Sequence, residues 1–201
     1  MSARYVVALS LGPVSRFIAA GRSSRDLWFG STWLSETTRR VAEHLQELPG
    51  TALLTPTAAR LKKVRERFSG DSAYGGRVAN KVLAVVTLDG GAPHAAALQA
   101  LLDGARDVAR TFLLGRLDAV RARFERWIDL PRFDAQREAI EAGDFLEFAA
   151  AWTALVGDSL GDATARAIAL RGAALRGFTH ASFSADGGER SDLDLGRDTV
   201  L

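Results

Sequence analysis

An apolar run that stops at a Gly-Pro pair is the feature that most restricts how this chain can fold. Tyr5 to Leu9 places apolar residues at successive positions, so the segment is predicted to be a strand buried on both faces. Gly12 permits a tight turn, and the fixed φ and missing N–H of Pro13 suit a first helical position. A strand followed at once by a helix is therefore expected, with Val14 and Phe17 on the apolar stripe of that helix.

Strand-like and helix-like periods alternate along the rest of the chain. Two more strands are predicted at 51–55 and 82–88. Further helices are predicted over about 31–48, 93–127, 134–156 and 162–175. The order strand, helix, strand, strand, long helices is how a ferredoxin-like β-α-β-β-α-β unit begins, so a fourth strand is expected around 176–183. The predicted fold class is therefore α+β, a ferredoxin-like sheet elaborated with several long helices.

Composition divides the chain into three parts. Residues 1–92 hold the strands and first helices, 93–178 form a helical region that completes or extends them, and 179–201 form a glycine- and charge-rich tail expected to be loop. Basic residues outnumber acidic ones by 19 to 11 in residues 1–127, whereas acidic residues outnumber basic ones by 13 to 7 thereafter. A basic body that faces phosphates or RNA fits this division, and solvated helix faces fit it equally well.

Several classes of site are excluded or disfavoured by composition. The chain has no cysteine, which excludes disulfides and thiolate metal sites. His44, His94 and His180 are far apart and none has a second ligand at metal-binding spacing. No apolar run approaches the ~18 residues that would span a bilayer, so a cytoplasmic location without membrane contact is expected.

Two short motifs resemble catalytic signatures without their usual context. Asp186 to Glu189 resembles a GGDEF or GGDD hairpin, but its flanks are polar and a solvated loop is favoured. Gly157 to Leu160 spells the nucleophile block of GDSL hydrolases, which requires a preceding strand and a downstream Asp-x-x-His. Here the block is expected to follow a helix and no Asp-x-x-His follows, so a hydrolase that uses Ser159 is the weakest alternative.

The turn after the first strand admits two interpretations. The amides of Gly12, Val14 and Ser15 could stand at a helix N-terminus, where unpaired donors and the helix dipole stabilise a phosphate. The spacing is that of neither a P-loop nor a dinucleotide fold. On the pattern alone, an ordinary strand-to-helix turn is therefore favoured over a nucleotide cradle.

Cations and aromatic residues alternate shortly after this turn, in the order Arg22, Arg25, Trp28 and Trp33. A face that binds nucleotides or nucleic acid has this composition. Packing of both tryptophans in the core, with the arginines solvated or paired to Asp26, explains the pattern as well and is favoured on composition.

The longest motif runs from Ser10 to Ser35, SLGPVSRFIAAGRSSRDLWFGSTWLS. It resembles the opening of the first palm domain in the large, polymerase-like subunit of type III-B CRISPR effector complexes, the Cmr branch. Ser15 stands where that family has glutamine. Weaker similarity to the family is found in three later segments: 79–84, 144–152 and 191–201.

The resemblance implies a specific function. In that family two palm domains bind two ATP molecules between them, and the second palm uses GGDD and two Mg or Mn ions to make cyclic oligoadenylate in antiviral defence. The first palm supplies a nucleotide-binding wall around its G-P-V turn, so the resemblance favours the cradle interpretation. The residues expected to contact ATP are Ser10, Gly12, Pro13 and Val14, with Phe17 anchoring the helix and Arg22 and Arg25 as second-choice ligands.

Resemblance also indicates what the chain should lack. It has no nuclease signature, no zinc-binding cysteines and no credible GGDD, so it is expected to be a catalytically incomplete palm half that binds metal only through a second palm. The expected partners are other effector subunits, with guide and target RNA in the full assembly. The alternative is a non-catalytic scaffold that docks those subunits and RNA without binding ATP.

Overall fold

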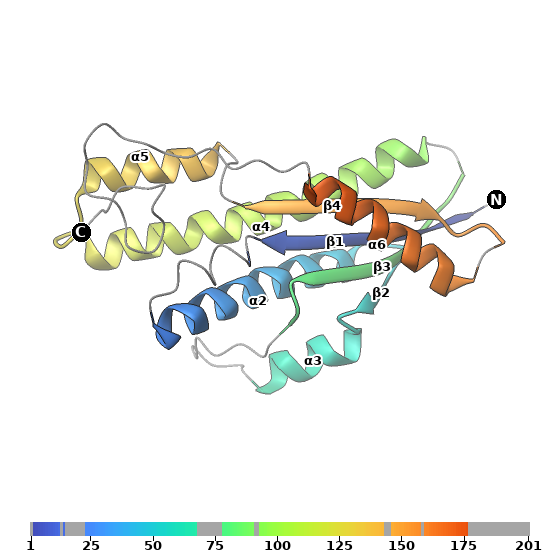
Figure 1. Ribbon diagram of the computed structural model, residues 1–201, viewed down its shortest axis with the longest axis horizontal. Helices are drawn as coiled ribbons and strands as arrows, with labels where there is room; N and C mark the ends of the chain where they lie inside the picture. Colours follow the sequence, from blue (N-terminus) through green and yellow to red (C-terminus); the bar gives the residue numbers. More distant parts are fainter. Residues whose placement is uncertain are drawn as a thin grey trace.

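A computed structural model describes residues 2–12, 14, 23–67, 78–90, 93–142, 146–157 and 159–176 of the 201-residue chain. Within these residues the chain forms four strands and five helices (Figure 1). In chain order the elements are β1 Ala3–Gly12, α2 Ser24–Glu47, β2 Thr51–Thr55, α3 Ala58–Arg67, β3 Lys81–Leu88, α4 His94–Phe124, α5 Leu130–Glu141, β4 Glu147–Ala154 and α6 Leu160–Arg176.

The four strands form one sheet in the order β2-β3-β1-β4. Every neighbouring pair is antiparallel, so β1 and β2 run in the same direction with β3 between them. The predicted mixed class with an antiparallel sheet and long helices is confirmed at this level. The strands predicted at 51–55 and 82–88 are confirmed as β2 and β3.

β1 lies at the centre of a three-layer arrangement (Figure 1). Val7, Leu9 and Leu11 face α2 and α4, whereas Val6 and Ala8 face α6 on the other side of the sheet. Successive side chains of a strand point to opposite faces, which is why an uninterrupted apolar run suits this position. Full burial of a side chain such as Leu9 contributes about 1.5–3 kcal/mol to the hydrophobic term.

The fourth strand is not where the sequence predicts it. The helix predicted over 134–156 is wrong: α5 begins at Leu130, capped by Asp129, and β4 occupies Glu147–Ala154. The fourth strand of this sheet is thus β4; of the range 176–183, where it was expected, Arg176 ends α6 and the rest lies outside the described residues. Alanine-rich β4 has a high local preference for helix, but pairing along the whole of β1 and burial between α4 and α6 outweigh that preference.

Other boundaries differ less from the expectation. α2 begins at Ser24, seven residues before the predicted start, and Thr37, Val41 and Leu45, which share one face of the helix, are fully buried. The basic segment after β2 forms α3, and the helix predicted over 162–175 is confirmed as α6. The helix predicted to begin at Pro13 and the tail 179–201 lie outside the described residues, apart from Val14.

α4 and α5 form a hairpin that extends beyond the sheet (Figure 1). Two ion pairs connect the helices, Arg121 Nε to Asp134 Oδ1 at 3.0 Å and Arg137 Nε to Asp118 Oδ1 at 2.7 Å. At the tip, Trp127 is 76% exposed.

No helix in the described part of the chain is long and apolar enough to cross a membrane.

Candidate functional site

The end of β1 is where the sequence places the nucleotide site. The side chain of Ser10 is buried, Gly12 is buried as the last residue of β1, and Val14 is partly exposed. Arg25 lies in the first turn of α2, but its side chain is outside the described residues. Pro13, Phe17 and Arg22 also lie outside them. The structure therefore describes three of the seven predicted residues in full.

A cavity of about 260 Å³ opens beside the end of β1. Val14 contributes to its wall, and the other lining residues come from the start of α2 and the segment before β3: Leu27, Gly30, Ser31, Leu34, Ser35, Val78, Ala79 and Asn80. This volume is below the ~300–1,000 Å³ of sites that enclose a drug-sized ligand. It suits a planar base or a single functional group better than a whole nucleotide.

Two polar side chains hold the walls of this cavity together. Asn80 donates from Nδ2 to the Leu11 carbonyl at 2.9 Å, and the Leu11 amide donates back to the Asn80 carbonyl at 3.0 Å. Ser35 Oγ accepts a hydrogen bond from the Val78 amide at 2.5 Å. The end of β1, helix α2 and the start of β3 are therefore fixed relative to one another at the cavity.

Sequence reasoning assigned no role to Ser35 or Asn80. Each residue lies inside a segment that carries the family resemblance, 10–35 and 79–84 respectively. Their place in these segments is the feature of the sequence that could have pointed to them. The hydrogen bonds themselves join positions 43 and 69 residues apart. A periodicity or turn pattern contains no information on such pairs.

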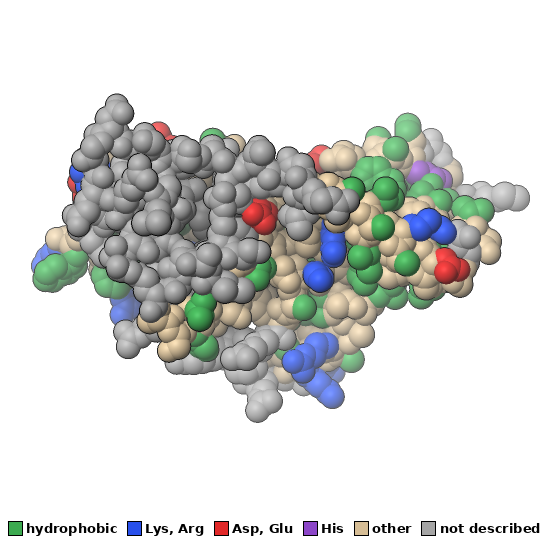
Figure 2. Space-filling view, viewed as in Figure 1, with side chains coloured by type: hydrophobic (Ala, Val, Ile, Leu, Met, Phe, Trp, Pro, Cys, Tyr) green, Lys and Arg blue, Asp and Glu red, His purple; other side chains and the backbone are tan. Residues whose placement is uncertain are grey.

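The opposite face of the end of β1 is polar. Ser10 Oγ is buried with no hydrogen-bond partner, and Ser10 pairs in register with exposed Lys81 of β3. A Cβ on Gly12 would overlap the carboxylate of Glu147, its register partner on β4. A side chain at Gly12 would therefore force the flexible Glu147 side chain to move, since the added Cβ would also lie 3.1 Å from the Glu147 Cβ. Figure 2 shows basic side chains on this face beside α6, with an acidic side chain nearby.

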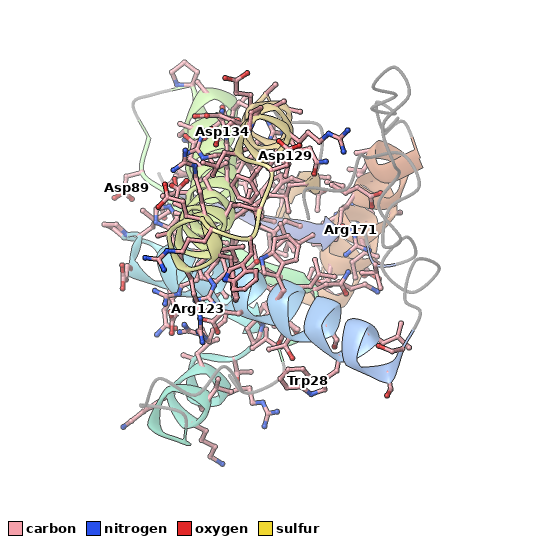
Figure 3. All side chains as sticks on the ribbon, turned by 90° about the vertical axis from the view of Figure 1, so that its left-hand side faces the viewer. Trp28, Asp89, Arg123, Asp129, Asp134 and Arg171 are labelled. Atoms are coloured by element: carbon pink, nitrogen blue, oxygen red, sulfur yellow. The ribbon has the colours of Figure 1, made fainter. Side chains whose placement is uncertain are left out.

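The two tryptophans near the start of α2 do not join the core. Trp28 and Trp33 are both partly exposed, and Figure 3 shows Trp28 on the outer side of α2. The favoured prediction that both pack in the core is therefore wrong. Their use as a nucleotide or nucleic-acid face stays a prediction, because the side chains of Arg22 and Arg25 are outside the described residues.

Ser159 has a structural role at the start of α6. Its Oγ accepts a hydrogen bond from the Asp162 amide at 3.1 Å and donates to Asp162 Oδ2 at 2.6 Å. This is helix capping, in which a side-chain oxygen satisfies an unpaired amide of the first turn. The expectation that a helix precedes this block is wrong, since β4 does, but the capping contacts give Ser159 a sufficient function without catalysis.

No three His, Cys, Asp or Glu side chains come together as possible metal ligands within the described residues. His94 instead shares a hydrogen bond of 2.9 Å between its Nδ1 and the Tyr5 hydroxyl, with the two rings in an edge-to-face arrangement.

Comparison with protein families gives one match. Residues 6–112 match the family described as CRISPR-associated protein Cmr2, N-terminal. The match covers more than half of the 201 residues, from β1 into α4, and includes every residue that lines the cavity at the end of β1. Among curated proteins no match was found.

Proposed function

Since the chain belongs to the N-terminal family of Cmr2, the large subunit of type III-B CRISPR effector complexes, we propose that it is the nucleotide-binding palm half of that subunit. The sheet order supports this proposal. Reversed, β2-β3-β1-β4 reads 4-1-3-2, with helices connecting β1 to β2 and β3 to β4. This is the arrangement of a β-α-β-β-α-β unit, the sheet on which polymerase-like palms are built.

The ligand is ATP, bound where β1 ends. The observation that carries this proposal is the cavity of about 260 Å³ whose wall joins Val14, directly after the Gly-Pro turn, to the segment 78–80. Its lining is mostly aliphatic with a few polar groups, as base-binding pockets are. The base occupies this cavity, and the phosphates extend past the end of β1.

The residues of this chain bind and orient the nucleotide. Val14, Leu34 and Val78 offer apolar contacts to the faces of a purine, while Ser31 lines the cavity with a hydroxyl. Ser35 and Asn80 act as positioning residues, because they hold the cavity walls through backbone groups at 2.5 Å and 2.9 Å. Binding of ATP in a fixed orientation is the contribution that a palm half makes to joining two nucleotides.

Nucleotidyl transfer itself requires a second palm. Metal-bound carboxylates stabilise the in-line transition state of that reaction. The described residues do not form such a ligand set, so no metal-dependent step is assigned to them. We propose that synthesis of cyclic oligoadenylate takes place only when a GGDD-bearing palm, with Mg or Mn, closes over the ATP held here.

One observation favours the alternative of a docking scaffold. Val120, Phe124 and Trp127 are 44%, 42% and 76% exposed at the tip of the α4–α5 hairpin. Clustered exposed apolar side chains mark surfaces that bind other proteins. Under this alternative the chain docks neighbouring effector subunits and RNA through the hairpin and does not need ATP.

An ATP titration of the 201-residue chain, followed by amide chemical shifts, separates the two functions. Nucleotide binding predicts shifts at Gly12, Val14 and the amides of 78–80 that saturate with ATP. A Trp127→Ala variant serves as the matched control, because its side chain lies far along the hairpin and should not alter these shifts. Absence of any shift at these amides, together with retained docking to effector subunits, would overturn nucleotide binding in favour of the scaffold.

A further inference from the structure

A buried cation on α6 has no ion-pair partner among the described residues. Arg171 is only 9% exposed, and its Nε is buried without a hydrogen bond. Within the described residues no carboxylate forms an ion pair with it. Burial lowers the pKa of the Arg171 guanidinium below its ordinary value. Buried charges without partners are rare in proteins because the lost hydration is not replaced, which makes this position unusual.

The helix places Arg171 on the side of α6 that faces the sheet, toward the carboxyl end of β1. Ala163, Ala167 and Arg171 lie four residues apart, so they form one stripe on the side of α6 that faces the strands (Figure 3). The first two pack on Val6 and Ala8 of β1. From Ala163 to Arg171 the helix advances about 12 Å.

The matching advance along β1 leads to Ser10. α6 and β1 run in the same direction (Figure 1). β1 is antiparallel to β4, and the chain reverses direction after β4 to form α6. Ser10 lies two residues beyond Ala8 on the face of β1 that packs against α6, about 13 Å along the strand from Val6. Arg171 and Ser10 therefore face the same region between α6 and the sheet, and both carry a buried polar atom without a partner.

Two charged residues of the neighbouring strands flank this region. On β3, Lys81 pairs in register with Ser10, so the two side chains lie on the same face of the sheet. Lys81 is exposed and forms no ion pair among the described residues. On β4, Glu147 pairs with Gly12, which lies two residues beyond Ser10 along β1. Glu147 has an interaction of its own and is not a free carboxylate. Arg171 and Lys81 thus bring two positive charges without ion-pair partners among the described residues to this region.

We propose that Arg171, Ser10 and Lys81 form a phosphate-binding subsite between α6 and the end of β1. A guanidinium offers a planar pair of donors that matches two phosphate oxygens, a hydroxyl donates one further hydrogen bond, and an exposed ammonium adds a point charge. A bound phosphate would replace the hydration that Arg171 loses by burial. The assignment of this phosphate to a nucleotide triphosphate rests on the proposed function, whereas the anion subsite itself does not.

Calorimetric titration of the full chain with tripolyphosphate, ATP and adenosine tests the proposal. We compare Arg171→Gln and Ser10→Ala with the matched control Arg166→Gln, an exposed arginine of the same helix. We expect tripolyphosphate to bind the unaltered chain and Arg166→Gln equally. Arg171→Gln should weaken binding about tenfold or more, because a charge-assisted hydrogen bond is lost, and Ser10→Ala should weaken it less. Adenosine binding should be the same in all four proteins.

The outcomes separate this proposal from the proposed function. Unchanged tripolyphosphate affinity in Arg171→Gln, with an unchanged melting temperature, would overturn the subsite while adenosine binding still supports the nucleotide site. Arg171-dependent binding of tripolyphosphate without any adenosine binding would support the subsite and contradict the base cavity. A chain that binds single-stranded RNA but neither ATP nor tripolyphosphate, and that loses RNA binding in Arg171→Gln, would overturn the nucleotide assignment. Arg171→Lys keeps the charge and should retain part of the affinity if the glutamine variant fails to fold.

Discussion

Asn80 and Leu11 hold each other through two hydrogen bonds, from Asn80 Nδ2 to the Leu11 carbonyl at 2.9 Å and from the Leu11 amide to the Asn80 carbonyl at 3.0 Å. The bonds join the segment before β3 to the end of β1, at the residue before Gly12. They set the width of the cavity at the end of β1, because Asn80 and Val14 are both part of its wall.

Replacement of Asn80 by alanine should therefore affect both stability and binding. Loss of the side-chain hydrogen bond leaves the Leu11 carbonyl without that donor, which should lower the free energy of unfolding by about 1–2 kcal/mol. ATP affinity should fall as the wall loosens. Urea unfolding and calorimetry measure the two effects. Gln99→Ala, which removes an exposed contact to Asp103 on α4, should change neither; an effect of equal size in both variants would contradict the role given to Asn80.

A side chain at Gly12 should conflict with Glu147. A Cβ there would overlap the Glu147 carboxylate and lie 3.1 Å from its Cβ, so Gly12→Ala should destabilise the chain by about 1–3 kcal/mol. Truncation of the neighbour in Gly12→Ala/Glu147→Ala should restore much of the loss. Melting curves of the two single variants and the double variant give the coupling. Additive effects would show that the alanine acts through backbone conformation instead.

The contact between α4 and α5 should weaken in acid. Hydrogen bonds and charge from Arg137 lower the pKa of Asp118 below its ordinary 3.8, and those from Arg121 lower the pKa of Asp134 in the same way. A carboxyl whose pKa is lowered by folding contributes stability that is present above the ordinary pKa and is lost as pH falls through the folded value.

Hydrogen exchange of α5 amides, measured between pH 5 and pH 2 and corrected for intrinsic rates, checks this expectation. Protection should decrease as pH falls below about 4, where Asp118 and Asp134 become protonated. In the Asp118→Asn/Asp134→Asn variant protection should be lower at pH 5 and should change little over the same interval. Equal pH dependence in both proteins would contradict a contribution from these pairs.

Trp127 should matter for docking and not for stability. Its side chain is 76% exposed, so Trp127→Ser should leave the melting temperature within about 2 °C of the unaltered chain, as surface substitutions do. If the hairpin tip contacts other effector subunits, co-purification with them should decrease. Arg116→Ser, an exposed change on α4, is the matched control. Assembly that is equally efficient in both variants would exclude the tip as a docking surface.

Much of the sheet could be predicted from local patterns. β1 and β3 carry continuous or alternating β-branched residues, and Pro49-Gly50 ends α2 where a turn is required. β4 could not be predicted in this way. Its sequence EFAAAWTA contains three consecutive alanines, which favour helix locally, and only the register with β1 from Gly12 to Tyr5 makes it a strand. That register is a long-range property that no window of sequence contains.

The candidate site was predicted in part for a similar reason. Gly12 and Val14 follow from the Gly-Pro turn and from the family resemblance, because both depend on adjacent positions. Ser35, Asn80 and Arg171 were missed. The hydrogen bonds of the first two span 43 and 69 residues. Arg171 is distinguished by its burial, which its place in an alanine-rich helix does not reveal.

Intermolecular nuclear Overhauser effects between ATP and the chain test the central claim most directly. With methyl-labelled protein, binding of the base at the end of β1 predicts contacts from adenine H2 or H8 to the methyl groups of Val14, Leu34 and Val78. Adenine contacts confined to methyl groups elsewhere, such as those of α5, would contradict a nucleotide site at this position.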